Sequence, residues 1–179
     1  MITVEPVNLE LIERQLSTIP GAVEKATKRS VKRTLQGGKQ DISRKIRARY
    51  TIKTSEVTKT LKVTSSGMTG EITSNGGRNP LKLFKISPRK RPKIPPAGGV
   101  RAVVVKGQGD ALKHAFLQKN GGVYERVGSS RFPIRALTGP SAPGMIGNEN
   151  VAPEVVAKMQ ERLGINFAHE ANAILGGFA

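Results

Sequence analysis

A long amphipathic segment constrains the fold of this chain more than any other feature. Between residues 21 and 50, apolar side chains recur at steps of four and seven, the spacing of one face of an α-helix. These side chains are Val31, Leu35, Ile42, Ile46 and Tyr50, and ten Lys and Arg residues lie between them. We therefore expect a long helix with an apolar side packed on the rest of the fold and a basic side opposite.

Two glycines interrupt this helix near its middle. Gly37 and Gly38 each cost about 1 kcal/mol relative to alanine in a helix interior. Either the helix is kinked at this point, or the small residues allow a close crossing by another segment. The sequence leaves both alternatives open.

Three further helices are predicted. Apolar residues three and four apart indicate a helix over residues 8–19. Thr54 or Ser55 is a candidate cap for a short helix that holds Val57 and Leu61. Pro153 opens a C-terminal amphipathic helix, which Gly176 and Gly177 end.

The segments between these helices read as short strands. A hairpin with glycines at 67 and 70 is expected over residues 61–72, and further strands are expected over 81–86, 100–106, 115–117, 123–127 and 132–137. Residues 107–110 read as a turn and residues 139–144 as a rigid loop. This order predicts an α+β fold, with N-terminal helices and a C-terminal helix packed on a mostly antiparallel sheet. A length of 179 residues fits a single domain over residues 1–179.

A proline-rich basic segment lies outside this scheme. Residues 87–99 contain four prolines and four Lys or Arg residues, so they cannot form a core element. We call these thirteen residues the arm, and we expect it to be exposed, mobile in the isolated protein and ordered on a partner.

The positive charge indicates an anionic partner. The formal net charge is +17, and the excess lies mainly in the first hundred residues. Such a field attracts polyanions or acidic protein surfaces, although a solvated basic surface that maintains solubility is an equal alternative. The candidate contact residues are on the long helix and on the arm: Arg29, Arg33, Arg44, Arg47, Arg89, Lys90, Arg91 and Lys93.

No constellation for catalysis is visible, and we expect neither enzymatic activity nor a cofactor. The chain has no cysteine, and its two histidines, His114 and His169, lack metal-ligand spacing. Asp41 and Asp110 are the only aspartates and lie far apart in sequence. A small hydrolase is therefore the weakest of the candidate functions. No apolar run reaches the roughly 20 residues of a membrane span, and no signal peptide is expected.

Four segments together resemble the minor tail protein Z family of phages and prophages. They are residues 49–61, 79–84, 113–126 and 131–145, and they occur in the family's order. The last is the most specific, because a strand with a Pro-Ile step runs into Gly-Pro-Ser and a further proline. Its motif residues are Arg131, Pro133, Ile134, Leu137, Gly139, Pro140, Ser141 and Pro143.

The resemblance implies a structural component of the virion. The expected location is the head-proximal end of a long non-contractile tail, after assembly in the host cytoplasm. There the protein would complete the tail for joining to the head and help to position the genome end. It implies other tail and head–tail joining proteins as partners and a homo-oligomeric ring, and it supplies no catalytic residues.

Genome DNA and an acidic ring of a neighbouring protein are alternative partners for the basic residues. DNA contacts would go to phosphates, because no base-reading motif is present. A sequence-nonspecific DNA-binding module therefore remains the alternative function. The chain has only seven aromatic residues, and this scarcity of stacking side chains favours the protein ring.

Overall fold

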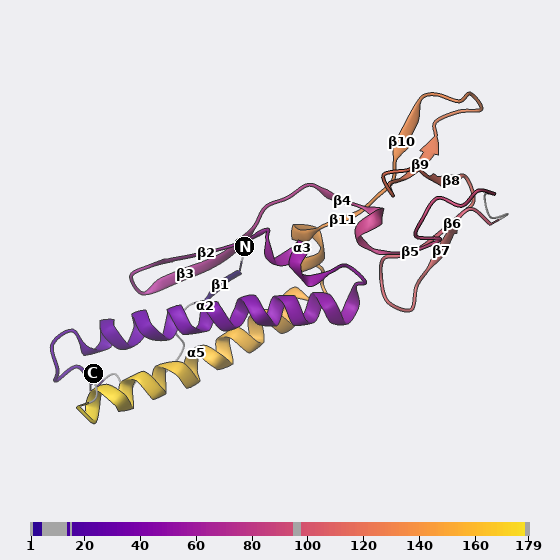
Figure 1. Cartoon of the computed structure of the whole chain (residues 1–179). Helices are drawn as coiled ribbons and strands as arrows, with labels where there is room; N and C mark the ends of the chain where they lie inside the picture. Colours follow the sequence, from indigo (N-terminus) through magenta and orange to yellow (C-terminus); the bar gives the residue numbers. More distant parts are fainter. Residues whose placement is uncertain (1, 5–13, 15, 95–97, 178–179) are drawn as a thin grey trace. The chain divides into compact units, whose positions relative to one another are not determined.

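The computed structural model describes residues 2–4, 14, 16–94 and 98–177 of the chain. The long helices lie toward the two ends of the chain and most of the antiparallel strands lie between them, which confirms the α+β fold class (Figure 1). The helices are α2 (Ala22–Arg49), α3 (Thr54–Thr58), the 3-10 helix η1 (Leu81–Leu83), α4 (Ala142–Ile146) and α5 (Ala152–Leu175). The strands are β1 (Ile2–Val4), β2 (Leu61–Ser66), β3 (Thr69–Ser74), β4 (Arg78–Pro80), β5 (Lys85–Ser87), β6 (Val100–Val103), β7 (Asp110–Leu112), β8 (Ala115–Leu117), β9 (Val123–Arg126), β10 (Ile134–Ala136) and β11 (Thr138–Ser141).

The strands form several small sheets instead of the single sheet that we expected. Their orders are β1-β3-β2, β10-β9-β8, β11-β4 and β5-β6-β7, and the described pairs are antiparallel. Most of these strands have three or four residues. Such short strands cannot extend into one wide sheet, because frequent glycines and prolines end the pairing.

The chain divides into two compact units. Unit 1 comprises Met1–Ser43, Thr60–Asn75 and Ile146–Ala179, and unit 2 comprises Arg44–Lys59 and Gly76–Met145. Each unit is assembled from separate stretches of sequence, because the chain leaves unit 1 twice and returns to it twice. The single domain over residues 1–179 therefore stays a prediction.

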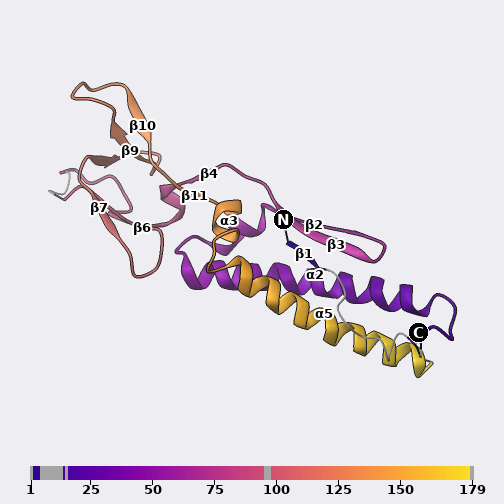
Figure 2. The same ribbon diagram turned by 180° about the vertical axis from the view of Figure 1, so that it is seen from behind.

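Unit 1 is built on two long helices. In both views α2 and α5 lie side by side, and the β2–β3 hairpin runs along α2 (Figures 1 and 2). Val31, Leu35 and Ile42 of the predicted apolar face are at most 2% exposed. A Cβ atom added to Gly70 would meet Leu35 Cδ1, and it would lie 3.0 Å from Val31 Cγ1. The predicted face of α2 thus packs directly on the backbone of β3.

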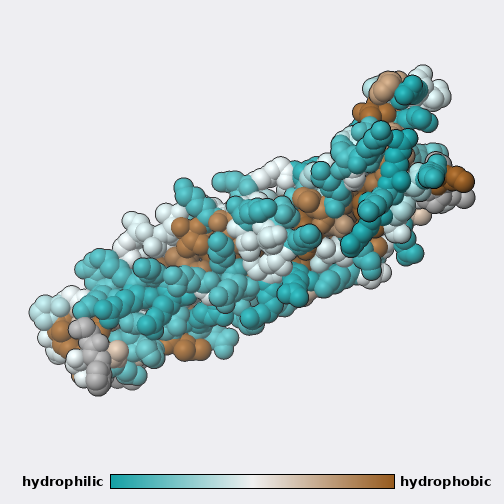
Figure 3. Space-filling view, in the orientation of Figure 1, coloured by the Kyte–Doolittle hydropathy of each residue, from teal (hydrophilic) through white to brown (hydrophobic). Residues whose placement is uncertain are grey.

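The structure decides the role of the two glycines in α2. The helix runs from Ala22 to Arg49 through both of them. An added Cβ on Gly37 would meet the Arg162 side chain, and one on Gly38 would lie 2.6 Å from Met159 Sδ. The glycines therefore make room for α5 side chains. Outside this contact the visible surface over α2 and α5 is mainly hydrophilic (Figure 3).

The C-terminal helix is confirmed, and the N-terminal one is mostly not described. Helix α5 begins at Ala152, with Pro153 in its first turn, and Gly176 follows its last residue. Of the helix predicted over 8–19, residues 8–13 and 15 lie outside the described residues. Leu16 is fully buried in a cluster with Ala26 and Phe167.

The structure corrects two predicted elements, the short helix near residues 54–61 and the strand over residues 81–86. The short helix α3 starts after Lys53 without a side-chain cap, and Leu61 lies in β2 instead. Residues 81–83 form η1 and not a strand, because Phe84 N donates to Leu81 O at 3.0 Å and both side chains are buried three residues apart. Strand β5 then begins at Lys85.

The strand predicted over residues 100–106 is shorter in the structure, because its last residues bond to the end of α2 and the segment that follows it. Strand β6 stops at Val103, where the chain changes partner. Thr51 N donates to Val104 O at 3.0 Å, and Lys106 N donates to Arg49 O at 2.8 Å. Asp110, which was read as part of a turn, instead begins β7.

The loop predicted over 139–144 is part of two regular elements. Strand β11 pairs with β4, and Asn79 Nδ2 donates to Pro140 O at 2.8 Å. Gly144 N donates to Ser141 Oγ at 3.1 Å, an arrangement in which a serine satisfies the first turn of a helix. Helix α4 consequently begins directly after β11.

Candidate functional site

Positive charge is concentrated in unit 2. This unit contains 20 of the 30 Lys and Arg residues but only three of the 13 Asp and Glu residues. Unit 1 contains the other ten basic and ten acidic residues, so its formal charges cancel. The whole net charge of +17 therefore belongs to unit 2. An anionic partner would be attracted to this unit.

The candidate contact residues fall into two groups. Arg29 and Arg33 lie in unit 1, where Arg33 Nη1 is 2.7 Å and Arg29 Nη1 is 3.7 Å from the Glu170 carboxylate. The Glu170 side chain is 4% exposed, so these arginines neutralise a buried charge on α5. The other six candidates, Arg44, Arg47, Arg89, Lys90, Arg91 and Lys93, belong to unit 2.

A basic cleft brings the end of α2 and the start of the arm together. Its volume is about 880 Å³, and both Arg47 and Arg89 line it. Four lysines join them in the lining: Lys53, Lys82, Lys85 and Lys106. Glu56 is an acidic lining residue, and Lys59 pairs with it at 3.0 Å.

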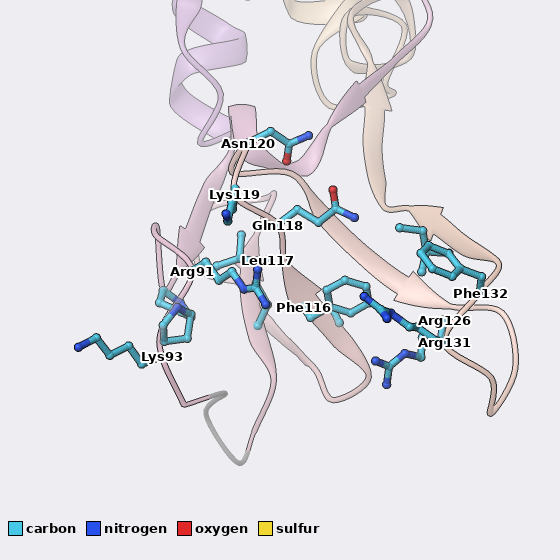
Figure 4. A pocket seen from close by; sticks show the side chains of 15 residues that line it. Arg91, Lys93, Phe116, Leu117, Gln118, Lys119, Asn120, Arg126, Arg131 and Phe132 are labelled. Carbon is cyan, nitrogen blue, oxygen red and sulfur yellow. The ribbon is translucent and has the colours of Figure 1, made fainter.

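A second cleft, which we call the arm cleft, lies between the arm and the β8–β9–β10 sheet. Its volume is about 630 Å³ (Figure 4). The arm contributes Pro88, Arg91, Pro92 and Lys93, and the opposite side contributes Phe116, Lys119, Arg126, Arg131 and Phe132 among others. Five lining residues are basic and none is acidic within the described part of the chain. The described part of the arm is otherwise largely exposed, as expected, while its mobility stays a prediction.

Two arginines of the arm cleft lie over aromatic rings. The Arg126 guanidinium carbon lies 5.7 Å from the centroid of the Phe116 ring, and the same distance separates Arg131 from the Phe132 ring. Phe116 also contacts Tyr124 on the neighbouring strand, at 6.4 Å between ring centroids. Figure 4 shows the Phe116, Arg126, Arg131 and Phe132 side chains at one end of the cleft.

The sequence interpretation missed this cluster. The low aromatic content was counted over the whole chain, yet three of its seven aromatics, Phe116, Tyr124 and Phe132, recur at intervals of eight. Antiparallel pairing then places Phe116 opposite Tyr124. The local density of aromatics between 116 and 132 was the signal that could have identified it.

Acid–base chemistry has little basis in the described residues. They contain no group of three or more His, Asp and Glu side chains that could hold a metal ion. In unit 1, a hydrogen bond from Lys28 and its charge, at 2.6 Å, lower the pKa of Glu24. Glu125, next to the arm cleft, pairs with Arg135.

Three of the four segments that carry the family resemblance, residues 79–84, 113–126 and 131–145, contribute strands that pair with one another in unit 2. Residues 79–80 pair with 138–141, as β4 with β11. The β8–β9 hairpin from residues 113–126 pairs with β10, which contains Ile134. The motif is thus a set of mutually paired strands. The sequence profile of prophage minor tail protein Z matches residues 8–176.

The chain belongs to the prophage minor tail protein Z family. This membership confirms the resemblance and makes the chain a structural protein of a phage tail, located in the tail of the virion. The family is one of structural proteins and not of known enzymes.

Other comparisons add no relative. Searches of curated proteins and of solved structures found no match. Among the described residues, no helix of this minor tail protein is long and apolar enough to cross a membrane.

Proposed function

We propose that this protein completes the tail at its head-proximal end and that unit 2 is the part that meets an anionic partner there. It would take this position as a homo-oligomeric ring, after assembly in the host cytoplasm. The partner is either the genome end or an acidic ring of a neighbouring tail protein. The observation that carries the proposal is the confinement of the whole +17 charge to unit 2.

The geometry of unit 2 supports this assignment. Two clefts expose cations from several segments at once: the end of α2, the arm and the β8–β9–β10 sheet. The cations at the end of α2 and on the β8–β9–β10 sheet are held on folded elements, so they bind a polyanion with less loss of conformational entropy than charges on a free tail. The neutral unit 1 does not compete for the same partner.

The first test neutralises the arm. The variant replaces Arg89, Lys90, Arg91 and Lys93 with Gln. We expect roughly a tenfold or larger drop in its incorporation into tails or in the infectivity of the resulting particles, because several anion contacts are lost together. The measurement is quantitative immunoblotting of purified tails, combined with plaque titres.

A matched control keeps the number of removed charges constant. Lys25, Lys32, Lys62 and Lys158 are exposed lysines of unit 1, and they are replaced with Gln in the control variant. We expect near-normal incorporation and titre. Equal behaviour of the two variants would show that only total charge matters and would contradict the assignment to unit 2.

The position in the tail is tested by electron microscopy of tails that carry a label on this protein. The proposal requires the label at the end that joins the head. The alternative function, a stand-alone nonspecific DNA-binding module, predicts DNA binding by the free protein but no label on purified tails. A label at the distal tip would contradict the head-proximal assignment.

A further inference from the structure

We propose that the arm cleft binds a single-stranded segment of nucleic acid, with bases stacked on Phe116 and Phe132 and phosphates held by the surrounding cations. This inference rests on the proposed function, since it names one anionic partner of unit 2. The juxtaposition that carries it is two aromatic rings, each with a guanidinium group over it, in one basic cleft.

The charges of the cleft are available for an external anion. Arg91, Lys93, Lys119, Arg126 and Arg131 line it, and in the described part of the chain no acidic residue lines it with them. Arg126 and Arg131 lie over aromatic rings instead of carboxylates. Guanidinium groups in this arrangement can contact phosphates while they remain stacked.

The aromatic side chains distinguish a nucleic acid from a purely acidic partner. The Phe132 side chain is 64% exposed, although it is a large apolar ring. An acidic peptide would satisfy the cations but would leave the exposed part of this ring in solvent. Bases stack on such rings regardless of sequence, which is the usual mode of single-strand binding.

The same rings favour a single strand over a duplex. A base can stack on a protein ring only when its face is not covered by neighbouring bases. A duplex would present phosphates to the cations but no free base face to Phe116 or Phe132. The Gln118 side chain also lines the cleft, where an amide can bond to an exposed base edge (Figure 4).

The experiment measures binding of fluorescent oligothymidylate of about 12 nucleotides to the full chain, beside a duplex of equal length. Fluorescence anisotropy is recorded between roughly 50 and 200 mM salt. We expect the single strand to bind at least about tenfold more tightly than the duplex. Equal affinity for the two probes would overturn the proposal.

Two variants locate the binding site. Phe132→Ala should weaken oligothymidylate binding by about tenfold and leave the salt dependence and duplex binding unchanged, because it removes stacking but no charge. Val127→Ala is the matched control, since Val127 is 63% exposed in the preceding loop and does not line the cleft. Equal affinities of both variants and the wild type would overturn the proposal. Phe116→Leu, which keeps an apolar side chain in a half-buried position, provides a second readout.

A competition experiment distinguishes the single-stranded nucleic acid from an acidic protein as the occupant of the arm cleft. A polyglutamate peptide is added to complexes of the oligonucleotide with the wild type and with Phe132→Ala. Equal displacement from both proteins would show that the cleft recognises charge alone, and this result would overturn the stacking site. Failure of this proposal remains distinct from failure of the proposed function. Normal oligonucleotide binding with no incorporation into tails would contradict only the proposed function. Normal incorporation into tails with no oligonucleotide binding would contradict only the single-strand binding site.

Discussion

Arg162 of α5 and Asp41 of α2 form an ion pair of 2.6 Å between Nη1 and Oδ2, and the Asp41 side chain is 2% exposed. Arg33 and Glu170 form the reciprocal pair, with the arginine on α2 and the acid on α5. In each helix the two participating residues are eight positions apart. The two pairs therefore specify the antiparallel register of α2 and α5 at two points, because a one-turn slip would leave two buried carboxylates without their cations.

Removing one of these carboxylates should destabilise unit 1. Asp41→Asn leaves Arg162 without its buried partner, and we expect a loss of about 2–4 kcal/mol in the free energy of unfolding. The lower part of this range applies because the Arg162 side chain is 32% exposed. Urea denaturation followed by circular dichroism measures the change. Glu161→Gln, at an exposed position one residue away on α5, should have no measurable effect.

The close contact at Gly38 predicts that the same substitution will destabilise the protein at this glycine and have little effect at another helical glycine. Gly38→Val inserts atoms against Met159 and Ile72, both of them buried, and should cost about 1–3 kcal/mol through overpacking. Gly164→Val on α5 has open space around its Cβ and should change stability by less than about 0.5 kcal/mol. Thermal unfolding of the two variants checks the prediction. A smaller loss for Gly38→Val than for Gly164→Val would contradict the packing described here.

The arm should be the first site of tryptic cleavage in the isolated protein. Arg89, Lys90 and Lys93 are exposed there, and Ile94 after the last of them is 84% exposed. Exposed lysines on α2, such as Lys25 and Lys32, should be cut later, because a protease requires a locally unfolded chain. Mass spectrometry of early fragments identifies the sites. The same bonds should be protected in assembled tails, and equal resistance of the arm and α2 in the free protein would argue against a mobile arm.

Purified protein should not hydrolyse DNA or peptides, with or without added Mg²⁺, Mn²⁺ or Zn²⁺. The reason is that the described residues offer no metal-binding cluster. Gel assays with plasmid DNA and with a denatured protein substrate measure this. Cleavage that is lost in His114→Ala or Asp110→Asn would disprove the prediction.

The two long helices could be predicted because their information is local. Apolar residues of α2 and α5 repeat with the helical period over more than twenty residues, and glycine or proline marks the ends. The β2–β3 hairpin could also be predicted, since two strand-like runs meet at Gly67. In the structure this glycine has a φ of +60°. The basic and proline-rich composition of the arm likewise identified an exposed segment.

The remaining features depend on pairs that are distant in sequence. Residues 81–83 have a strand-like pattern, but the contact of Leu81 N with Leu137 O and the burial of Phe84 select a 3-10 turn. From the sequence, Arg29 and Arg33 are interpreted as free surface cations. In the structure, Glu170 of α5 lies beside them and pairs with both.

The candidate site also arises only in the tertiary structure. The arm cleft needs the arm to lie near three strands that begin sixteen or more residues after its end, so the sequence shows how many aromatic residues there are but not where they lie. Composition determined by itself that the protein carries a net charge of +17. The fold decided which residues carry that charge together, because the chain passes repeatedly between a neutral unit and a basic unit. The local electrostatic field depends on which charges lie close together in space and not on their order in the sequence.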